Sequence, residues 1–292
     1  MDWFIFAILT ALLTGIQSIV QKKVLFKEHA MSFSATLAVV IAFITLPFLF
    51  IVDFSLIPGI AWVVMYFTSV LGSIAFLLIA KAVRHMDMSS SSPLLVIGPA
   101  FTALVAWILL GENITFQHMI GIFLLIVGSY VLELKPHHGL FEPVRVFIRS
   151  KYIHYIVLAL ILYALCASGD RFVLGSSNIG VSAESYLAII HFFLAINYLI
   201  MISVFHDGVR EIKDGLKRNG WWVLLIAALT FGYRYFQAQA VKLVNVALVS
   251  AIKRLAALFS TIIGGELFHE KNLLRKSIAC VVMLGGALLV IL

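Results

Sequence analysis

The sequence is poor in charged residues, in cysteine and in long polar segments. Charged residues make up 12% of its 292 residues, about half of the share in a typical soluble protein, whereas apolar residues make up 62%. This composition excludes a water-soluble globular fold, and no polar stretch is long enough for a separate soluble domain. Cys166 and Cys280 are the two cysteines, and both lie inside apolar runs. They therefore indicate neither a disulfide framework nor a metal site, and we expect no cofactor.

The apolar residues form a series of runs that are long enough to cross a bilayer, which takes about 20 residues. We predict an all-α polytopic membrane protein with about ten transmembrane helices. The predicted spans are 3–21, 32–51, 58–80, 89–110, 115–134, 152–174, 182–204, 220–241, 246–266 and 273–292. Between the seventh and eighth spans, residues 205–219 have the pattern of a short amphipathic surface helix. Pro93 and Pro99, together with Gly98, predict a kink in the fourth span.

The two halves of the chain resemble each other. A shift of 158 residues aligns 80–132 with 238–290 without a gap and pairs polar landmarks such as Glu112 with Glu270. Two halves of five spans each must lie in opposite orientations, because five is odd. The sequence therefore predicts an inverted repeat, in which substrate sites lie near the midplane between the halves. We assign 1–134 to the first repeat, 135–151 to the connection and 152–292 to the second repeat.

The net charge of +7 arises from Lys and Arg residues that lie mainly in short segments between apolar runs, so it does not indicate a nucleic-acid partner. Such segments are typical of topology signals that face the headgroups of anionic lipids. The basic residues cluster after the first, third, fifth, seventh and ninth spans. The positive-inside rule then places both termini outside the cytoplasm.

Lys253 and Arg254 stand in the middle of the ninth predicted span. A cation near the centre of a bilayer costs roughly 2.5–3.5 kcal/mol on insertion scales, so two adjacent cations require a compensating environment. One interpretation is an internal ion pair, and the other is a binding site for an anionic substrate. Their counterparts in the first repeat are Leu95 and Val96. This asymmetry favours a ligand site in one half over a structural feature of both repeats.

Polar residues late in the eighth span are further candidates for substrate binding. Arg234 and Gln237 lie three residues apart and Tyr233 and Gln237 lie four apart, so each pair shares a helix face. This stripe suits either an interfacial belt or an extension of the cationic lining. Asp170, at the end of the sixth span, is either half of a water-facing pair with Arg171 or the counter-charge of Lys253 and Arg254 in the empty carrier.

The seventh span and two helix ends contain further candidates. Glu184 and His191 lie seven residues apart and so share one face, and His191 titrates near neutrality in water. They are candidates for proton coupling, although a single histidine that bonds between helices is the simpler interpretation. Glu112 and Glu270 follow small residues at helix ends, and we interpret them as interfacial caps or anchors. The glycine pairs Gly121 and Gly128, Gly264 and Gly265, and Gly285 and Gly286 permit close contact between helices.

These features resemble the drug/metabolite transporter superfamily in its EamA-type, ten-helix form. The resemblance rests on Ser92-Pro-Leu-Leu-Val-Ile-Gly-Pro-Ala and Leu110-Gly-Glu112 in the first half, and on Gly265-Glu-Leu-Phe-His-Glu270 in the second. The Lys253-Arg254 pair is also similar to the phosphate-binding pair of the plastid sugar-phosphate translocators. The resemblance implies a secondary transporter that works by alternating access. It also implies a multi-pass protein, for which we expect a prokaryotic inner membrane and a structure compatible with a homodimer.

Motifs of hydrolases, metalloproteases and P-loop ATPases are absent from the sequence, so we expect no enzymatic activity. We predict a carrier for a small anionic or zwitterionic metabolite whose carboxylate or phosphate binds Lys253 and Arg254. Asp170 or Glu184 could instead neutralise that pair, which would favour an exporter of amino acids or of cationic or amphipathic drugs. The sequence is also compatible with a flippase for lipid-linked anions and with a membrane scaffold that transports nothing.

Overall fold

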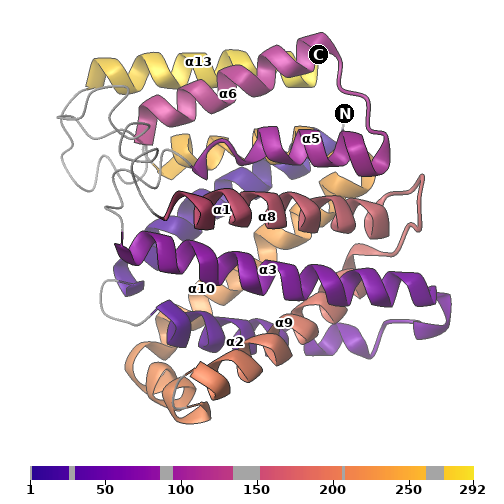
Figure 1. Cartoon of the computed structure of the whole chain (residues 1–292), viewed down its shortest axis with the longest axis vertical. Coiled ribbons are helices and arrows are strands. Elements are labelled where there is room, and N and C mark those ends of the chain that lie inside the picture. Colours follow the sequence, from indigo (N-terminus) through magenta and orange to yellow (C-terminus); the bar gives the residue numbers. More distant parts are fainter. Residues whose placement is uncertain (1, 26–29, 86–94, 134–151, 206–207, 261–272) are drawn as a thin grey trace.

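The computed structural model describes residues 2–25, 30–85, 95–133, 152–205, 208–260 and 273–292, and within these ranges all regular structure is helical (Figure 1). The first half contains α1 (Asp2–Leu25), α2 (Ala30–Leu49), η1 (Phe54–Leu56), α3 (Gly59–His85), α5 (Gly98–Leu110) and α6 (Phe116–Glu133). The second half contains α8 (Ile153–Leu174), α9 (Ala183–Phe205), α10 (Val209–Leu243), α11 (Val246–Ile252) and α13 (Leu273–Ile291).

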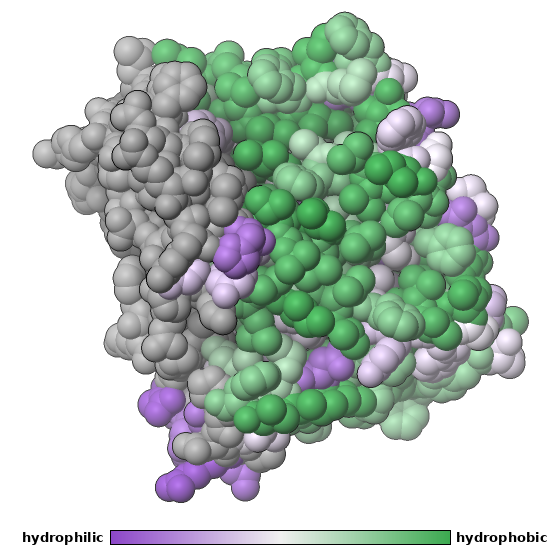
Figure 2. All heavy atoms as spheres, viewed as in Figure 1, coloured by the Kyte–Doolittle hydropathy of each residue, from purple (hydrophilic) through white to green (hydrophobic). Residues whose placement is uncertain are grey.

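Each of the ten predicted spans is helical over most of its described residues, so the all-α fold class is confirmed. In a bilayer, helices pair every backbone amide and carbonyl internally, which is why long apolar runs take this form. By length and apolarity, five helices can cross a membrane: α1, α2, α3, α8 and α9. α5, α6 and α13 are apolar but shorter. Figure 2 shows that apolar side chains cover the middle of the visible surface, as a lipid-facing surface requires. The predicted connection 135–151 lies outside the described residues.

The packing of the helices has the reciprocity that an inverted repeat requires. α1 packs extensively against α10, and its counterpart α8 packs equally extensively against α3, the counterpart of α10. α2 packs against its own counterpart α9, and α6 packs against α13. Figure 1 shows α6 and α13 side by side at one edge of the molecule, with both chain ends on one side. The two five-helix halves are therefore interleaved, and the space between them is bounded by helices from both.

Glycines set the close approach of α6 and α13. A Cβ atom on Gly286 would lie 2.8 Å from the carbonyl oxygen of Gly121 and 2.9 Å from the amide nitrogen of Leu125. A Cβ on Gly128 would lie 3.0 Å from the carbonyl oxygen of Ala279. The two backbones touch at these points, which confirms the predicted role of Gly121, Gly128 and Gly286. The prediction is wrong for Gly285, where an added Cβ would have nothing within 4 Å, and Gly264 and Gly265 lie outside the described residues.

Two spans are interrupted, and one helix bends. Val96 and Ile97 form a turn before α5 begins at Gly98, which agrees with the predicted kink. α11 ends at Ile252, and a second helical segment covers 255–260 after a turn at Lys253 and Arg254. This second interruption was not predicted. α10 bends at Asn219, whose backbone is not helical (φ −134°, ψ 22°). The bend separates the predicted amphipathic segment from the eighth span.

Candidate functional site

The turn between α11 and the segment 255–260 determines where Lys253 and Arg254 point. The Lys253 amide still donates to the Val249 carbonyl at 3.0 Å, four residues back. The Arg254 amide donates to Ala251, only three residues back, and the next bonds also span three residues. The helix therefore tightens at the two cations, and their side chains leave it in different directions.

Lys253 points toward the polar stripe of α10. Its Nζ atom donates to Gln237 Oε1 at 2.8 Å and lies 4.6 Å from the centre of the Tyr233 ring. A carbonyl oxygen and the face of an aromatic ring both attract an ammonium group. The structure therefore brings together Lys253, predicted as a midspan cation, with Tyr233 and Gln237, predicted as parts of the polar stripe of the eighth span.

Arg234 and Asp170 complete what we call the charged cluster, namely Asp170, Arg234 and Lys253. Both Arg234 and Asp170 lie close enough to Lys253 to act on its charge. Asp170 accepts a hydrogen bond from the hydroxyl of Tyr186 and also faces Arg234. Two basic side chains thus face one acidic side chain, an arrangement that the negative group of an anion can complement.

Tyrosines that were not predicted surround Arg234. The side chains on α8 and α9 that lie within its electrostatic range are Tyr163, Cys166, Asp170, Tyr186, His191 and Tyr198. Tyr163, Tyr186 and Tyr198 were not predicted, because a tyrosine without a charged neighbour is common in membrane helices and attracts no attention in a sequence. A usable signal was present on α8, because Tyr163, Cys166 and Asp170 are spaced i, i+3, i+7 and therefore share one helix face.

The three side chains of the charged cluster are only partly buried. The neighbouring apolar residues of α11, in contrast, are fully packed. A ligand that binds at the cluster has to satisfy its charged and hydrogen-bonding groups.

Arg254 takes a different direction from Lys253. Its Nη2 atom lies 2.8 Å from the position that a Cβ on Gly98 would occupy, next to Leu160. The guanidinium of the second half thus rests on the first residue of α5, close to the interruption in the first half. Gly98 leaves the room that this contact needs.

Glu184 and His191 are not joined by a hydrogen bond in the described part of the chain. Glu184 Oε1 accepts from the Tyr235 hydroxyl at 2.9 Å, and that hydroxyl accepts from Gln239 Nε2 at 3.1 Å. His191 is 2% exposed, and neither ring nitrogen has a hydrogen-bond partner among the described residues. The coupling role of these two residues stays a prediction.

Arg171, next to Asp170, belongs to a separate network that we call the latch. Its Nε atom lies 3.0 Å from Glu112 Oε1, and its Nη1 atom donates to the carbonyl oxygen of Val241 at 2.5 Å. Glu112 also accepts from the Val246 amide at 3.2 Å. The latch therefore ties the α5–α6 connection of the first half to α8 and to the α10–α11 turn of the second half.

The latch settles two predictions about helix ends. Arg171 is 9% exposed, so the interpretation of Asp170 and Arg171 as a water-facing pair is wrong for Arg171. Glu112 accepts the first amide of α11, which agrees with its predicted role as a cap or anchor. Burial raises the pKa of Glu112, and the charge and hydrogen bonds of Arg171 oppose that rise. The repeat-related Glu270 lies outside the described residues.

Comparisons with known proteins agree with this architecture. A solved crystal structure of another protein superimposes with a TM-score of 0.75 and 14% sequence identity, over 99% of this chain and 96% of that one, which shows a shared fold. No curated protein matches the sequence. The model of the EamA-like transporter family matches residues 1–134 and 153–292. The chain therefore belongs to the EamA-like transporter family, whose members are membrane transporters of small substrates.

Proposed function

We propose that the protein is a secondary transporter of a small polar metabolite whose carboxylate or phosphate binds between Lys253 and Arg234. The observation that carries this proposal is the charged cluster, in which two basic side chains and one carboxyl group lie within electrostatic range of one another. Guanidinium and ammonium groups form strong, short hydrogen bonds with carboxylates and phosphates. Arg254 supports the site from the α5 side, where it rests on Gly98.

Binding would exchange partners within the cluster. Asp170 provides the negative charge near Lys253 and Arg234, while Gln237 accepts from Lys253. An incoming anion takes over that role, and Asp170 keeps the hydrogen bond from Tyr186. Because Asp170 lies on α8 and Lys253 follows α11, this exchange changes the attraction between helices. A ligand that alters packing in this way shifts the balance between two conformations, which alternating access needs.

The latch is a second feature that supports alternating access. It links the two halves at one end of the bundle through a buried ion pair and bonds to backbone groups. In this proposal, that end of the bundle opens to solvent only when the latch breaks. Residence in a prokaryotic inner membrane, with both termini outside the cytoplasm, stays a prediction.

The proposal is tested by a thermal-stability screen of the purified protein with carboxylates, phosphates, amino acids and organic cations. A ligand at 100 times its Kd should stabilise the protein by about 2.7 kcal/mol. We expect carboxylates or phosphates to stabilise the wild type, and Lys253→Met and Arg234→Met to abolish the effect. Lys242→Met, on the same helix as Arg234 but outside the cluster, serves as the matched control. Stabilisation by anions that survives both cluster substitutions would refute the proposal.

A second candidate is an exporter of amino acids or of cationic or amphipathic drugs, because Asp170 places a carboxylate among tyrosines. Here the positive group of the ligand would bind Asp170. Asp170→Asn separates the two candidates. It should abolish stabilisation by cations if this candidate is correct, and it should preserve or strengthen stabilisation by anions if the first is correct.

A further inference from the structure

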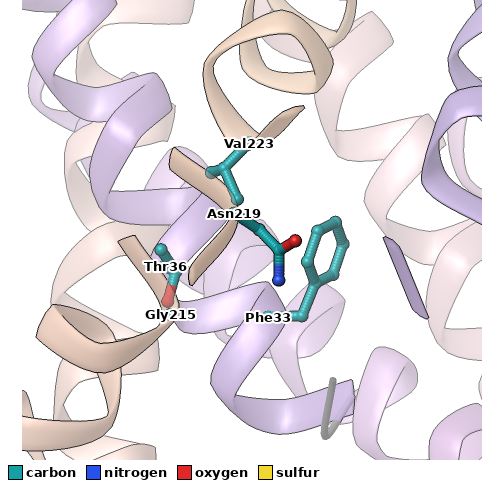
Figure 3. A pocket seen from close by; sticks show the side chains of 5 residues that line it. All are labelled: Phe33, Thr36, Gly215, Asn219 and Val223. Atoms are coloured by element: carbon teal, nitrogen blue, oxygen red, sulfur yellow. The ribbon is translucent and has the colours of Figure 1, made fainter. Parts of the chain in front are cut away.

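The first ten residues of α10 form an arm, residues 209–218, that precedes the bend at Asn219. Three contacts fix the arm on α2. Ile212 is 5% exposed and packs in one cluster with Met31 and Ala35, and Glu211 accepts a hydrogen bond from Ser32. A Cβ on Gly215 would lie 3.1 Å from the Thr36 hydroxyl. Figure 3 shows the small pocket at the joint between the arm and α2. The arm is therefore held as a rigid part of the bundle.

The outward face of the arm carries a stripe of charge. Arg210, Lys213, Asp214 and Lys217 are all exposed, and their spacing of i, i+3, i+4, i+7 places them on one helix face. We call these four residues the basic stripe. In the part of the chain that the structure describes, no carboxylate lies within ion-pair distance of its three cations. The stripe thus presents three positive groups and one negative group to its surroundings.

The surface beside the basic stripe is apolar and faces outward. Trp221, two residues after the bend, is 73% exposed, and Val204 and Phe205 at the end of α9 are also highly exposed. Figure 2 shows hydrophilic side chains gathered at the corner of the molecule where α10 begins, next to the apolar flank. An exposed tryptophan beside a cationic face is typical of the boundary between headgroups and hydrocarbon. The stripe therefore lies at the depth of the headgroups.

We propose that the basic stripe is a binding site for the phosphate groups of anionic phospholipids. Cations near an anionic membrane surface each contribute about 1 kcal/mol, and here they are fixed on a docked helix rather than on a mobile loop. Zwitterionic lipids offer no net charge and should bind weakly. The basic stripe lies on the surface of the protein, so the proposal does not depend on the substrate or on the charged cluster.

Native mass spectrometry of the purified full-length chain tests the proposal, with phosphatidylglycerol and phosphatidylcholine as the two probes. The wild type should bind phosphatidylglycerol in preference. Lys213→Gln/Lys217→Gln should weaken the apparent affinity for it by about 30-fold, because two surface cations are lost. Asp214→Asn should strengthen it by about fivefold for the same reason. Lys242→Gln, which removes a cation at the other end of α10, should leave it unchanged.

Several outcomes would overturn the proposal. One is equal binding of both lipids by the wild type, and another is an unchanged phosphatidylglycerol affinity in the double variant. If Lys242→Gln weakens phosphatidylglycerol binding as much as the single substitution Lys213→Gln does, only the net charge of the protein determines lipid binding. Glycerol 3-phosphate at millimolar concentration serves as the competitor that lacks acyl chains. If it displaces the lipid fully, the stripe is a site for a soluble phosphate and not for a membrane lipid.

Discussion

Removal of the Arg171 guanidinium should strongly destabilise the protein. Arg171→Met deletes the bond of 3.0 Å to Glu112 and the bonds to the carbonyl oxygens of Val241 and Lys242. Among the described residues, Glu112, which is 8% exposed, then keeps only the Val246 amide as a partner. Loss of one member of a buried ion pair costs about 3–5 kcal/mol, because the other charge remains buried without compensation.

The double variant Glu112→Gln/Arg171→Met separates this mechanism from a simple loss of packing. The glutamine oxygen can still accept from Val246, and no buried charge remains. We therefore expect the double variant to be more stable than the sum of the two single costs implies, with a coupling energy of about 2 kcal/mol.

The assay is the free energy of unfolding in mixed micelles of dodecylmaltoside and sodium dodecyl sulfate, measured for the wild type, both single variants and the double variant. Lys217→Met, at an exposed position, is the control and should change stability by less than about 0.5 kcal/mol. Strictly additive costs would refute the ion-pair reasoning. A cost of Arg171→Met no larger than that of the control would show that the latch does not hold the halves together.

Three further predictions test other parts of the structure. Burial raises the pKa of Glu112, so the folded protein holds the proton of this carboxyl group more tightly than the unfolded chain does. The free energy of unfolding should therefore fall as the pH rises from about 4.3 through the raised pKa. Glu112→Gln should flatten this dependence of the unfolding free energy on pH. Gly98→Ala should displace the Arg254 guanidinium without removing its charge. We therefore expect a loss of less than about 1 kcal/mol of stability, together with weaker anion binding in the thermal-stability screen. Unchanged anion binding would place Arg254 outside the site. Gly286→Ala should cost about 1–3 kcal/mol of unfolding free energy, because the new Cβ meets backbone atoms of α6. Gly285→Ala, whose Cβ would have nothing within 4 Å, should be neutral. Equal effects of the two substitutions would contradict the close packing of α6 and α13.

Hydropathy alone predicts most of the fold, because a bilayer leaves helices as the simplest way to pair the backbone of a long apolar segment. The span predicted at 182–204 is helix Ala183–Phe205, and the one predicted at 58–80 lies within Gly59–His85. The interruption at Lys253 could not be predicted in the same way. Its run is apolar on both sides and contains no proline, so nothing local indicates that the hydrogen bonds tighten there.

The candidate site was predicted in part, and for a physical reason. Lys253, Arg234 and Gln237 are costly in a membrane, so each attracts attention from the sequence alone. Tyr186 donates a hydrogen bond to Asp170 of the cluster, yet a tyrosine is inexpensive in many membrane positions. The cost of polarity therefore identifies the charges of a site but not the hydroxyl groups that orient them.

Asp170 and Arg171 show why adjacent residues of opposite charge can have unrelated partners. Successive residues on an α-helix point about 100° apart, so Asp170 faces the charged cluster while Arg171 faces Glu112 in the latch. The two networks are thus joined by a single turn of α8, which moves as a unit. A ligand that replaces Asp170 beside Lys253 and Arg234 acts on the segment that also holds Arg171. We therefore expect ligand stabilisation to be weaker or stronger in Arg171→Met than in the wild type, and an identical response would show that the site and the latch are energetically independent.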